Sequence, residues 1–430
     1  MTYIIRIIGS ALILMLNLAG IAAADGDPGD FSIRFGMGYD FVSQEYFTSS
    51  SRYDTSLSPD PDLTDITLLS KDYLDDKKGL VYVTLNPRNE GRYILETGWE
   101  QTPDILRALG RGHLTVGGKD SRLESDFDFE IKRRCRGDAE IGEDLSVLKG
   151  KTKYIRRLSE QVESSLRIYG ENVAFDSTSS LVYNYSRFGG ELGFSIFTRN
   201  FNSIFFNAGV ETRDVPDSSQ LNFLQLRGSL GYFGSLGGSQ ISADLTIENK
   251  DYDSPDNRDD YLLITLYGNA KVPASENIFV RPLGNLEYFD FRSDEFINRD
   301  YLLARGGLLV GRDYSRISLA LGPKFQLHSI SSDYEGDDDY LEYMAFGSID
   351  FFYSDRILCL IENQAGRRGY QNDPVYYSDF TFNRLSLIGS FKLLGTLNLD
   401  LLFSAEWEWH EIESDDSRLY LLSSGLSYTF

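Results

Sequence analysis

A two-residue rhythm of apolar and polar side chains runs through several long segments of this 430-residue chain. From Leu397 to His410 the odd positions carry Leu, Phe, Ala or Trp, whereas the even positions, apart from Leu402, carry Asn, Asp, Ser, Glu or His. A similar alternation recurs, with few exceptions, over residues 204–213, 241–248 and 317–328. Because successive side chains of a β-strand point to opposite faces, these segments are predicted to be strands with one apolar and one polar face.

Two chemically different kinds of connection alternate between the predicted strands after Ser203. Short connections recur about every 40 residues, which suits a pair of spanning strands with its loops; they lie at residues 234–238, 273–276, 312–315, 354–355 and 394–396. Strongly acidic connections lie between them, at residues 251–260, 294–295, 333–339 and 411–416. Outer-membrane barrels have tight turns at the periplasmic rim and longer loops at the outer rim, so we expect the acidic connections to be extracellular.

A soluble β-sandwich would also show alternation, but its turns come about every 8 to 12 residues. Trp407 and Trp409 lie near the predicted outer rim, where membrane barrels carry aromatic girdles. After Ala24 no continuous apolar stretch reaches the ~20 residues that a membrane helix needs, and the mean hydropathy is −0.28. These features favour a membrane barrel over a sandwich and exclude a helical membrane protein.

The pattern is weaker before Ser203, where hairpins are predicted at Gly91–Gly117, Ser121–Arg157 and Ser159–Arg199. A first strand at Phe31–Val42 and a second at Gly79–Leu85 would flank a long polar outer loop, Ser43–Lys78, within which Ile66–Ser70 could form a further strand. The sequence therefore predicts an all-β fold: a single transmembrane antiparallel up-and-down β-barrel of about 20 strands, within a range of roughly 18 to 22.

The first residues have the composition of a secretory signal peptide. Arg6 precedes an almost wholly apolar run, Ile7–Leu18, and Ala22 to Ala24 form a small-residue cleavage site. We therefore expect residues 1–24 to be removed, residues 25–430 to form the barrel, and the protein to reach the outer membrane of a Gram-negative bacterium. Only about six residues, Asp25–Asp30, precede the first predicted strand, which argues against a TonB-dependent transporter with an N-terminal plug.

The end of the sequence resembles the terminal strand of Gram-negative outer-membrane β-barrel proteins, a porin-like class. In that class the chain usually ends in Phe, here Phe430, after apolar or aromatic residues at every second position, here Tyr428, Leu426, Leu422 and Tyr420, with Ser424 as an exception. The resemblance implies that Tyr428 and Phe430 belong to an assembly signal for the barrel-assembly machinery. It also implies that lipid and lipopolysaccharide of the outer membrane surround the protein.

Charged and polar residues at the inward positions of the predicted strands would line the lumen. The candidates are Glu211, Arg213, Arg227, Asp244, Glu248, Lys271, Arg281, Glu287, Lys324, His328, Glu362, Arg368, Arg384, Asp400, Glu406 and Glu408. Barrels of about 16 to 18 strands already enclose a water-filled channel. We therefore predict a hydrated channel or cavity for hydrophilic solutes or a polysaccharide. The alternative is a structural or surface-interaction barrel with a blocked lumen, whose acidic loops bind partners or divalent cations.

One basic cluster interrupts an otherwise acidic chain, whose formal net charge is −23. It comprises Lys132, Arg133, Arg134, Arg136, Lys149, Lys151, Lys153, Arg156 and Arg157. It could line a constriction or bind anions, but we favour an exposed loop and strand end that pairs with lipopolysaccharide phosphates or with acidic loops. The net negative charge argues against nucleic acid as a partner.

No cofactor, metal site or enzymatic activity is predicted. The run Asp333–Asp339 lacks the spacing of a specific calcium loop, so we expect a solvated acidic loop. His328 with Ser329 is the one neighbourhood that a minor alternative, an outer-membrane hydrolase, would use, but adjacent strand residues point to opposite faces. The two cysteines, Cys135 and Cys359, are not expected to pair, because Cys359 falls on a lipid-facing position.

Overall fold

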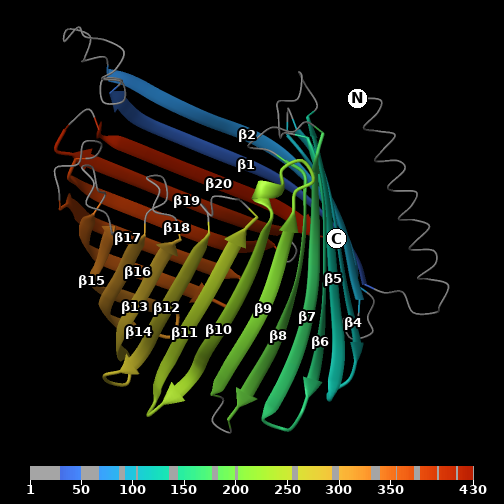
Figure 1. The fold of residues 1–430 in the computed structure, drawn as a ribbon. Coiled ribbons are helices and arrows are strands. Elements are labelled where there is room, and N and C mark those ends of the chain that lie inside the picture. The colour runs from blue at the N-terminus through green and yellow to red at the C-terminus, as the bar shows by residue number, and fades with distance from the viewer. Residues whose placement is uncertain are drawn as a thin grey trace.

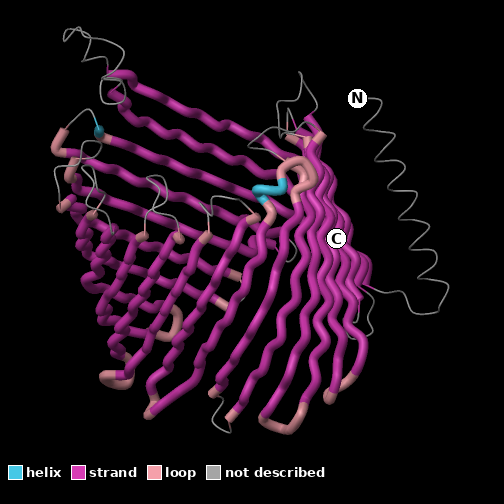
Figure 2. The backbone as a smooth tube through the Cα atoms, viewed as in Figure 1, coloured by secondary structure: helices cyan, strands magenta, loops and turns pink. Residues whose placement is uncertain are grey.

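Strands account for almost all of the chain that the computed structural model describes (Figure 2). The described residues are 30–49, 67–86, 93–102, 105–134, 144–176, 183–198, 202–253, 260–292, 300–330, 339–354, 356–371, 378–394, 397–412 and 415–429. The signal peptide, Cys135, Arg136, Phe430 and most of the acidic connections lie outside these residues. What the sequence predicts for those segments stays a prediction.

Twenty strands are linked in chain order. They are β1 (Asp30–Ser49), β2 (Thr67–Asn86), β3 (Tyr93–Gln101), β4 (Ile105–Gly117), β5 (Ser121–Arg134), β6 (Leu145–Arg157), β7 (Val162–Phe175), β8 (Tyr185–Phe197), β9 (Ser203–Asp214), β10 (Phe223–Leu236), β11 (Ser239–Tyr252), β12 (Tyr261–Pro273), β13 (Ile278–Phe291), β14 (Tyr301–Asp313), β15 (Ile317–Ile330), β16 (Tyr340–Tyr353), β17 (Ile357–Tyr370), β18 (Phe380–Leu394), β19 (Leu397–His410) and β20 (Ser417–Thr429). A short 3-10 helix, η3 (Ser219–Leu221), precedes β10. No helix among the described residues has the length and apolarity needed to cross a membrane.

Each strand pairs antiparallel with its neighbours along the chain, which gives the up-and-down order of the sheet (Figure 1). The first strand, β1, pairs with β2 on one side and with β20 on the other, from Arg34 opposite Thr429 to Tyr46 opposite Ser417. The strand order therefore has no free edge in these pairings, and the backbone groups of β1 and β20 satisfy one another. The predicted all-β, antiparallel, up-and-down fold is confirmed.

The three predicted hairpins before Ser203 are confirmed as β3–β4, β5–β6 and β7–β8. The long polar loop predicted over Ser43–Lys78 is wrong at both ends, because Ser43–Ser49 continues β1 and Thr67–Lys78 belongs to β2. Ile66–Ser70 is likewise no separate strand, since β2 begins at Thr67 and runs on. The physical reason is backbone pairing: β1 and β2 pair with each other over their full length and extend together beside β20 (Figure 1), so side-chain polarity does not end them.

Tight turns connect the strands at the rim opposite the acidic connections. Between β10 and β11 the chain reverses through Gly237 and Gly238, which have φ angles of 58° and 88°. Gly117 ends β4 at a φ of 124°, and a Cβ atom there would lie 2.3 Å from the carbonyl oxygen of Ser121. These positive φ angles favour glycine because an L residue is strained in this backbone conformation. The short connections predicted from the sequence at residues 234–238, 273–276 and 312–315 each contain the turn between two consecutive strands or its start, although their first residues still belong to β10, β12 and β14.

At the acidic rim, an Asp or Asn stands directly before each even-numbered strand from β6 to β20. Its side-chain Oδ1 accepts a hydrogen bond from a backbone N–H at the end of the preceding strand; for example, Asp300 accepts from Phe291 at 2.7 Å and Asp379 from Tyr370 at 2.8 Å. The full set is Asp144, Asn184, Asn222, Asp260, Asp300, Asp339, Asp379 and Asp416. We call these residues the Asx caps. They close eight hairpins by satisfying an N–H that would otherwise lack a partner.

The Asx caps are testable at Asp260, which is 4% exposed. Asp260→Ala leaves the N–H of Tyr252 without its acceptor, so we expect it to lower the free energy of unfolding by about 1 to 3 kcal/mol. Asp260→Asn is the matched control, because Asn184 and Asn222 fill the same role in this chain. Equilibrium urea unfolding in detergent micelles measures both. Equal losses for the Ala and Asn variants would contradict the capping role.

Candidate functional site: the inner wall of the barrel

The two faces of the sheet differ in exposure. The apolar positions of the alternating strands are strongly exposed; for example, Leu230 is 50%, Val310 54% and Leu321 66% exposed. The opposite face carries most of the charged residues and also most of the buried ones, among them Leu309, Glu342 and Phe382, each at most 2% exposed. Side chains on the concave face of a curved sheet crowd together, whereas those on the convex face splay apart. The charged face is therefore the inner wall, and the exposed apolar face is the outer surface.

The strand register places every predicted lumen-lining residue on this inner wall. Residues that face each other in an antiparallel pair point to the same side of the sheet. Glu211 lies opposite Gln225, Arg227 lies opposite Glu248, and Arg384 lies opposite Glu406. Followed from strand to strand, the register puts the remaining candidates on the same face of the sheet, from Asp244 on β11 to Asp400 on β19. Cys359 falls on the outer surface, as predicted from the alternation.

Between β4 and β6 the inner wall is a ladder of charges whose sign changes from strand to strand. On β4 the charged inward residues are basic, and Arg107 pairs with Glu130 of β5 at 2.6 Å. On β5 the middle inward positions are acidic, and Asp126 lies 3.4 Å from Lys151 of β6 and 2.6 Å from His113 of β4. The ladder continues onto β7, where Glu171 is 2.8 Å from Lys149. Unlike charges on opposed or diagonal positions of neighbouring strands stabilise a sheet.

The predicted basic cluster divides between the two faces. Lys149, Lys151 and Lys153 lie within β6 and point inward, opposite Asp128, Asp126 and Glu124 of β5. Lys132, Arg134 and Arg157 also point inward, whereas Arg133 and Arg156 point outward. Lys149, Lys151 and Lys153 therefore lie within a strand and not in an exposed loop, whereas the pairing of the cluster with lipopolysaccharide phosphates stays a prediction. Their spacing of two puts them on one face of a strand, and neighbouring carboxylates partner Lys149 and Lys151.

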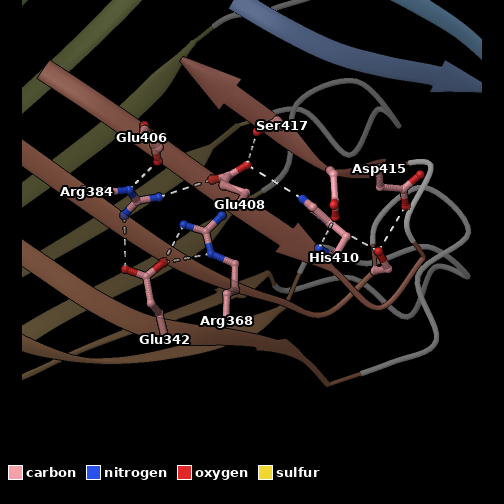
Figure 3. Close-up of polar contacts among 10 residues, drawn as sticks. Glu342, Arg368, Arg384, Glu406, Glu408, His410, Asp415 and Ser417 are labelled. Atoms are coloured by element: carbon pink, nitrogen blue, oxygen red, sulfur yellow. Dashed lines mark hydrogen bonds and ion pairs between the residues drawn. The ribbon is translucent and has the colours of Figure 1, made fainter. Parts of the chain in front are cut away.

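An ionic network around one buried carboxylate, Glu342, occupies the inner wall from β16 to β19 (Figure 3). Glu342, 1% exposed, accepts two hydrogen bonds from Arg368, at 2.7 and 2.9 Å, and lies 3.5 Å from Arg384. Arg384 in turn bonds Glu406 and lies 3.5 Å from Glu408. The Glu342 carboxylate on β16 thus contacts the guanidinium groups of Arg368 on β17 and Arg384 on β18. Arg384 extends the network to β19, so four strands are linked.

A serine, a histidine and carboxylates meet where this network reaches the acidic rim. The Ser378 Oγ lies 3.1 Å from His410 Nδ1 and donates to Asp415 Oδ2 at 3.0 Å, and His410 Nε2 lies 3.7 Å from Glu408. A serine nucleophile must give its proton to the imidazole. Here that proton goes to Asp415, so the arrangement joins the ends of β18, β19 and β20 without activating a nucleophile. His328 instead lies between the rings of Tyr301 and Tyr340.

An aromatic belt follows the acidic rim of the inner wall from β10 to β19. Its rings contact one another within three groups: Phe223 with Tyr252, Tyr261 through Tyr370, and Phe380 with Phe382 and His410. Within the middle group, Phe289 stacks on Tyr301 with centroids 5.3 Å apart, and His328 stacks on Tyr340 at 5.1 Å. Two clusters of cations lie over its ends, with Lys250 3.9 Å from the centroid of Phe223 and Arg368 4.2 Å from that of Tyr340. The belt comprises Phe223, Tyr252, Tyr261, Phe289, Phe291, Tyr301, His328, Tyr340, Tyr370, Phe380, Phe382 and His410.

The sequence analysis missed this belt, although the sequence carries a signal for it. An Asp or Asn followed by Tyr or Phe recurs at intervals of 38 to 40 residues, as Asn184-Tyr185, Asn222-Phe223, Asp260-Tyr261, Asp300-Tyr301, Asp339-Tyr340 and Asp379-Phe380. The first residue of each dipeptide is an Asx cap, and the second begins a strand and points inward. One repeated dipeptide thus closes the hairpin and positions a ring.

A polar hollow of about 340 Å³ opens in the inner wall next to one end of the belt. It spans β7 to β10, and Arg167, Glu191, Asn207, Glu211, Gln225 and Arg227 line it. Gly209 is also in the lining, where a Cβ atom would lie 3.2 Å from the carbonyl oxygen of Gly190. The hollow exists because glycine leaves the wall bare between longer polar side chains.

Near the short-turn rim the inner wall is apolar instead. Phe279, Leu309, Ala320 and Phe346 form a buried cluster on β13 to β16. Two of the predicted lumen residues cover it, with the Nζ atom of Lys271 4.1 Å from the centroid of Phe279 and that of Lys324 3.3 Å from the centroid of Phe346. These lysines therefore lie flat over rings, and their stems extend the apolar cluster.

Comparison with known proteins supports the fold. No family model and no curated protein sequence matches the chain. Solved structures do match: a mutant form of the ferric enterobactin receptor PfeA from Pseudomonas aeruginosa has a TM-score of 0.52 and 7% identity over 92% of this chain and 80% of that one. The siderophore receptor PirA from Acinetobacter baumannii gives 0.53 and 8% over the same shares, and the alcaligin outer-membrane receptor FauA from Bordetella pertussis gives 0.51 and 10% over 94% and 76%. The chain has the fold of Gram-negative outer-membrane β-barrel proteins.

The ionic network around Glu342 makes a quantitative prediction. Glu342→Ala leaves Arg368 without its carboxylate, while Arg384 keeps Glu406 and Glu408, so we expect a loss of about 3 kcal/mol in the free energy of unfolding. Asp128→Ala is the control, because its pair with Arg111 has side chains 49% and 69% exposed and should contribute less than about 1 kcal/mol. Urea unfolding in micelles measures both variants. A Glu342→Ala protein as stable as the Asp128→Ala protein would show that the network is not stabilising.

Proposed function

We propose that this protein spans the outer membrane of a Gram-negative bacterium and encloses a hydrated channel or cavity for hydrophilic solutes or a polysaccharide. The observation that carries the proposal is the contrast between the two faces of one sheet. A band of exposed apolar side chains such as Leu230, Leu308 and Phe325 surrounds a wall that carries ion pairs on β3 to β9, between β12 and β14, and on β16 to β19. Hydrocarbon outside and water inside account for both faces at once.

The orientation and the partners are part of this proposal. The short turns face the periplasm and the acidic connections face the medium, as the rim chemistry of such barrels requires. Residues 1–24 act as a cleaved signal peptide. The outward side chains Tyr420, Leu422, Leu426 and Tyr428 of β20 supply the signal for the barrel-assembly machinery, and lipid with lipopolysaccharide covers the apolar band. The wall carries nearly equal numbers of both charge signs, so the acidic loops dominate the field at the mouth.

The rival function is a barrel with a blocked lumen that acts through its acidic loops. Single-channel recording of the purified protein in planar bilayers separates the two. We expect discrete current steps, and in a salt gradient a reversal potential of weak cation preference, because acidic loops raise the local cation concentration at the mouth. An absence of steps at every applied voltage would contradict the channel, and an anion preference would contradict the role given to the loops.

A further inference from the structure

The cations at the two ends of the aromatic belt differ in their partners. At the β16–β18 end, Arg368 and Arg384 bond carboxylates directly. At the β9–β11 end, no carboxylate among the described residues lies within 4 Å of the cationic nitrogens of Arg213, Arg227 or Lys250. Arg213 donates instead to the backbone carbonyl of Leu221, at 3.0 Å. These three cations therefore lie on adjacent strands without a direct ion pair among the described residues. Glu248 lies opposite Arg227 in the register, and Glu211 lies opposite Gln225, but neither carboxylate forms a close ion pair with the three cations.

These three cations lie beside the polar hollow and the first ring of the aromatic belt. Arg227 lines the polar hollow and is exposed to the lumen, and Gln225 joins the hollow to Phe223, two residues along β10. Lys250 lies directly opposite Gln225, and Arg213 lies opposite Phe223. Both cations contact the Phe223 ring, with centroid distances of 3.9 Å for Lys250 and 4.6 Å for Arg213. The polar hollow, the three cations and the first rings of the belt thus form one continuous patch.

The chemistry of this patch matches a sugar that carries a carboxylate. Sugar rings present C–H groups on their faces and hydroxyl groups at their edges. The half-buried rings of Tyr252 and Tyr261 can pack against the faces. The amides of Asn207 and Gln225 can bond hydroxyl groups, and guanidinium groups bond carboxylates. A hollow with a few convergent polar groups beside apolar rings is the usual form of a ligand site.

The acidic loops do not prevent such binding. Their field is screened over about 8 Å at physiological salt. Arg213, Arg227 and Lys250 would meet the ligand at contact distance, where screening is weak. The loops then oppose free anions in solution more than an anion that is already held by rings and amides.

We infer that Arg213, Arg227 and Lys250, with the hollow and the adjoining belt rings, bind a carboxylated saccharide unit inside the lumen. This inference rests on the proposed function, because it requires a hydrated lumen that a saccharide can enter. It goes beyond that function by naming the ligand class and the wall segment that binds it. The belt continues from this patch to β19, and Lys250 lies over the rings of both Tyr252 and Tyr261, so a longer chain of the same sugar can extend along the belt.

Calorimetric titration of the full chain in detergent micelles tests the site. The probes are a hexamer of galacturonic acid and the same hexamer with every carboxyl group methyl-esterified. We expect the acid to bind at least about tenfold more tightly than the ester, because only the acid forms charge-assisted bonds with the three cations. Equal affinities would overturn the inference. Equally tight binding of tripolyphosphate would overturn the saccharide part of it.

Variants locate the site. Lys250→Gln and Arg213→Gln should each weaken binding of the acid about tenfold and change binding of the ester little. Tyr252→Leu should weaken both probes, since it removes a ring face. Arg305→Gln is the matched control, because Arg305 is also an inner-wall cation but lies on β14, where Gln326 is its partner. A loss at Arg305→Gln equal to that at Lys250→Gln would show nonspecific attraction and overturn the site.

Two further measurements separate a loss of binding from unfolding, and the saccharide site from the channel. Circular dichroism melting of each variant shows that the barrel is folded, so a loss of binding in a folded variant is a local effect. Single-channel recording of the same preparation separates the two proposals. Current steps with no binding of either hexamer would overturn the saccharide site and leave the channel standing. An absence of both steps and binding would overturn the channel and the site together.

Discussion

Backbone pairing around a cylinder between hydrocarbon and water is the constraint on which this structure depends. Every strand needs partners on both sides, since an unpaired N–H or C=O in a membrane has no water to bond. Pairing of β1 with both β2 and β20 meets this need at the seam. The two-residue alternation follows, because one side of each strand meets lipid and the other meets the lumen.

The inner wall meets a second need, which is to hold many charges close together without repulsion. On β4 to β7 it does so by alternating sign from strand to strand, as in the contacts of Asp126 with His113 and Lys151. On β16 to β19 it does so around one buried carboxylate, Glu342. Beside the hollow, Arg213, Arg227 and Lys250 lie on adjacent strands without a direct ion pair among the described residues, and two of them contact the Phe223 ring instead. The two ion-paired regions stabilise the wall. The segment with Arg213, Arg227 and Lys250 is the place where an anionic solute would bind.

The fold and the facing of individual residues could be predicted from the sequence, because both depend on local alternation. The strand over Leu397–His410 and the inward direction of Arg384 and Glu406 follow from a period of two. The extension of β1 and β2 could not be predicted, since cross-strand pairing and not apolar alternation sustains it. The partner of Glu342 is 26 residues away, and only the register brings Arg368 to it. The belt was within reach of the sequence, but its signal is a dipeptide repeated about every 39 residues and not a local pattern.

Neighbouring residues on one strand of this barrel face different solvents. Ser229 and Leu230 on β10 are adjacent, and the register points the first inward and the second outward. Single-cysteine variants at these two positions, in a chain whose Cys135 and Cys359 are replaced by Ser, can be reconstituted in vesicles. A membrane-impermeant thiol reagent should label the cysteine at position 229 rapidly and the one at position 230 slowly, and a fluorophore at position 230 alone should be quenched by nitroxide-bearing lipid. Equal labelling of the two positions, without quenching at position 230, would contradict the account.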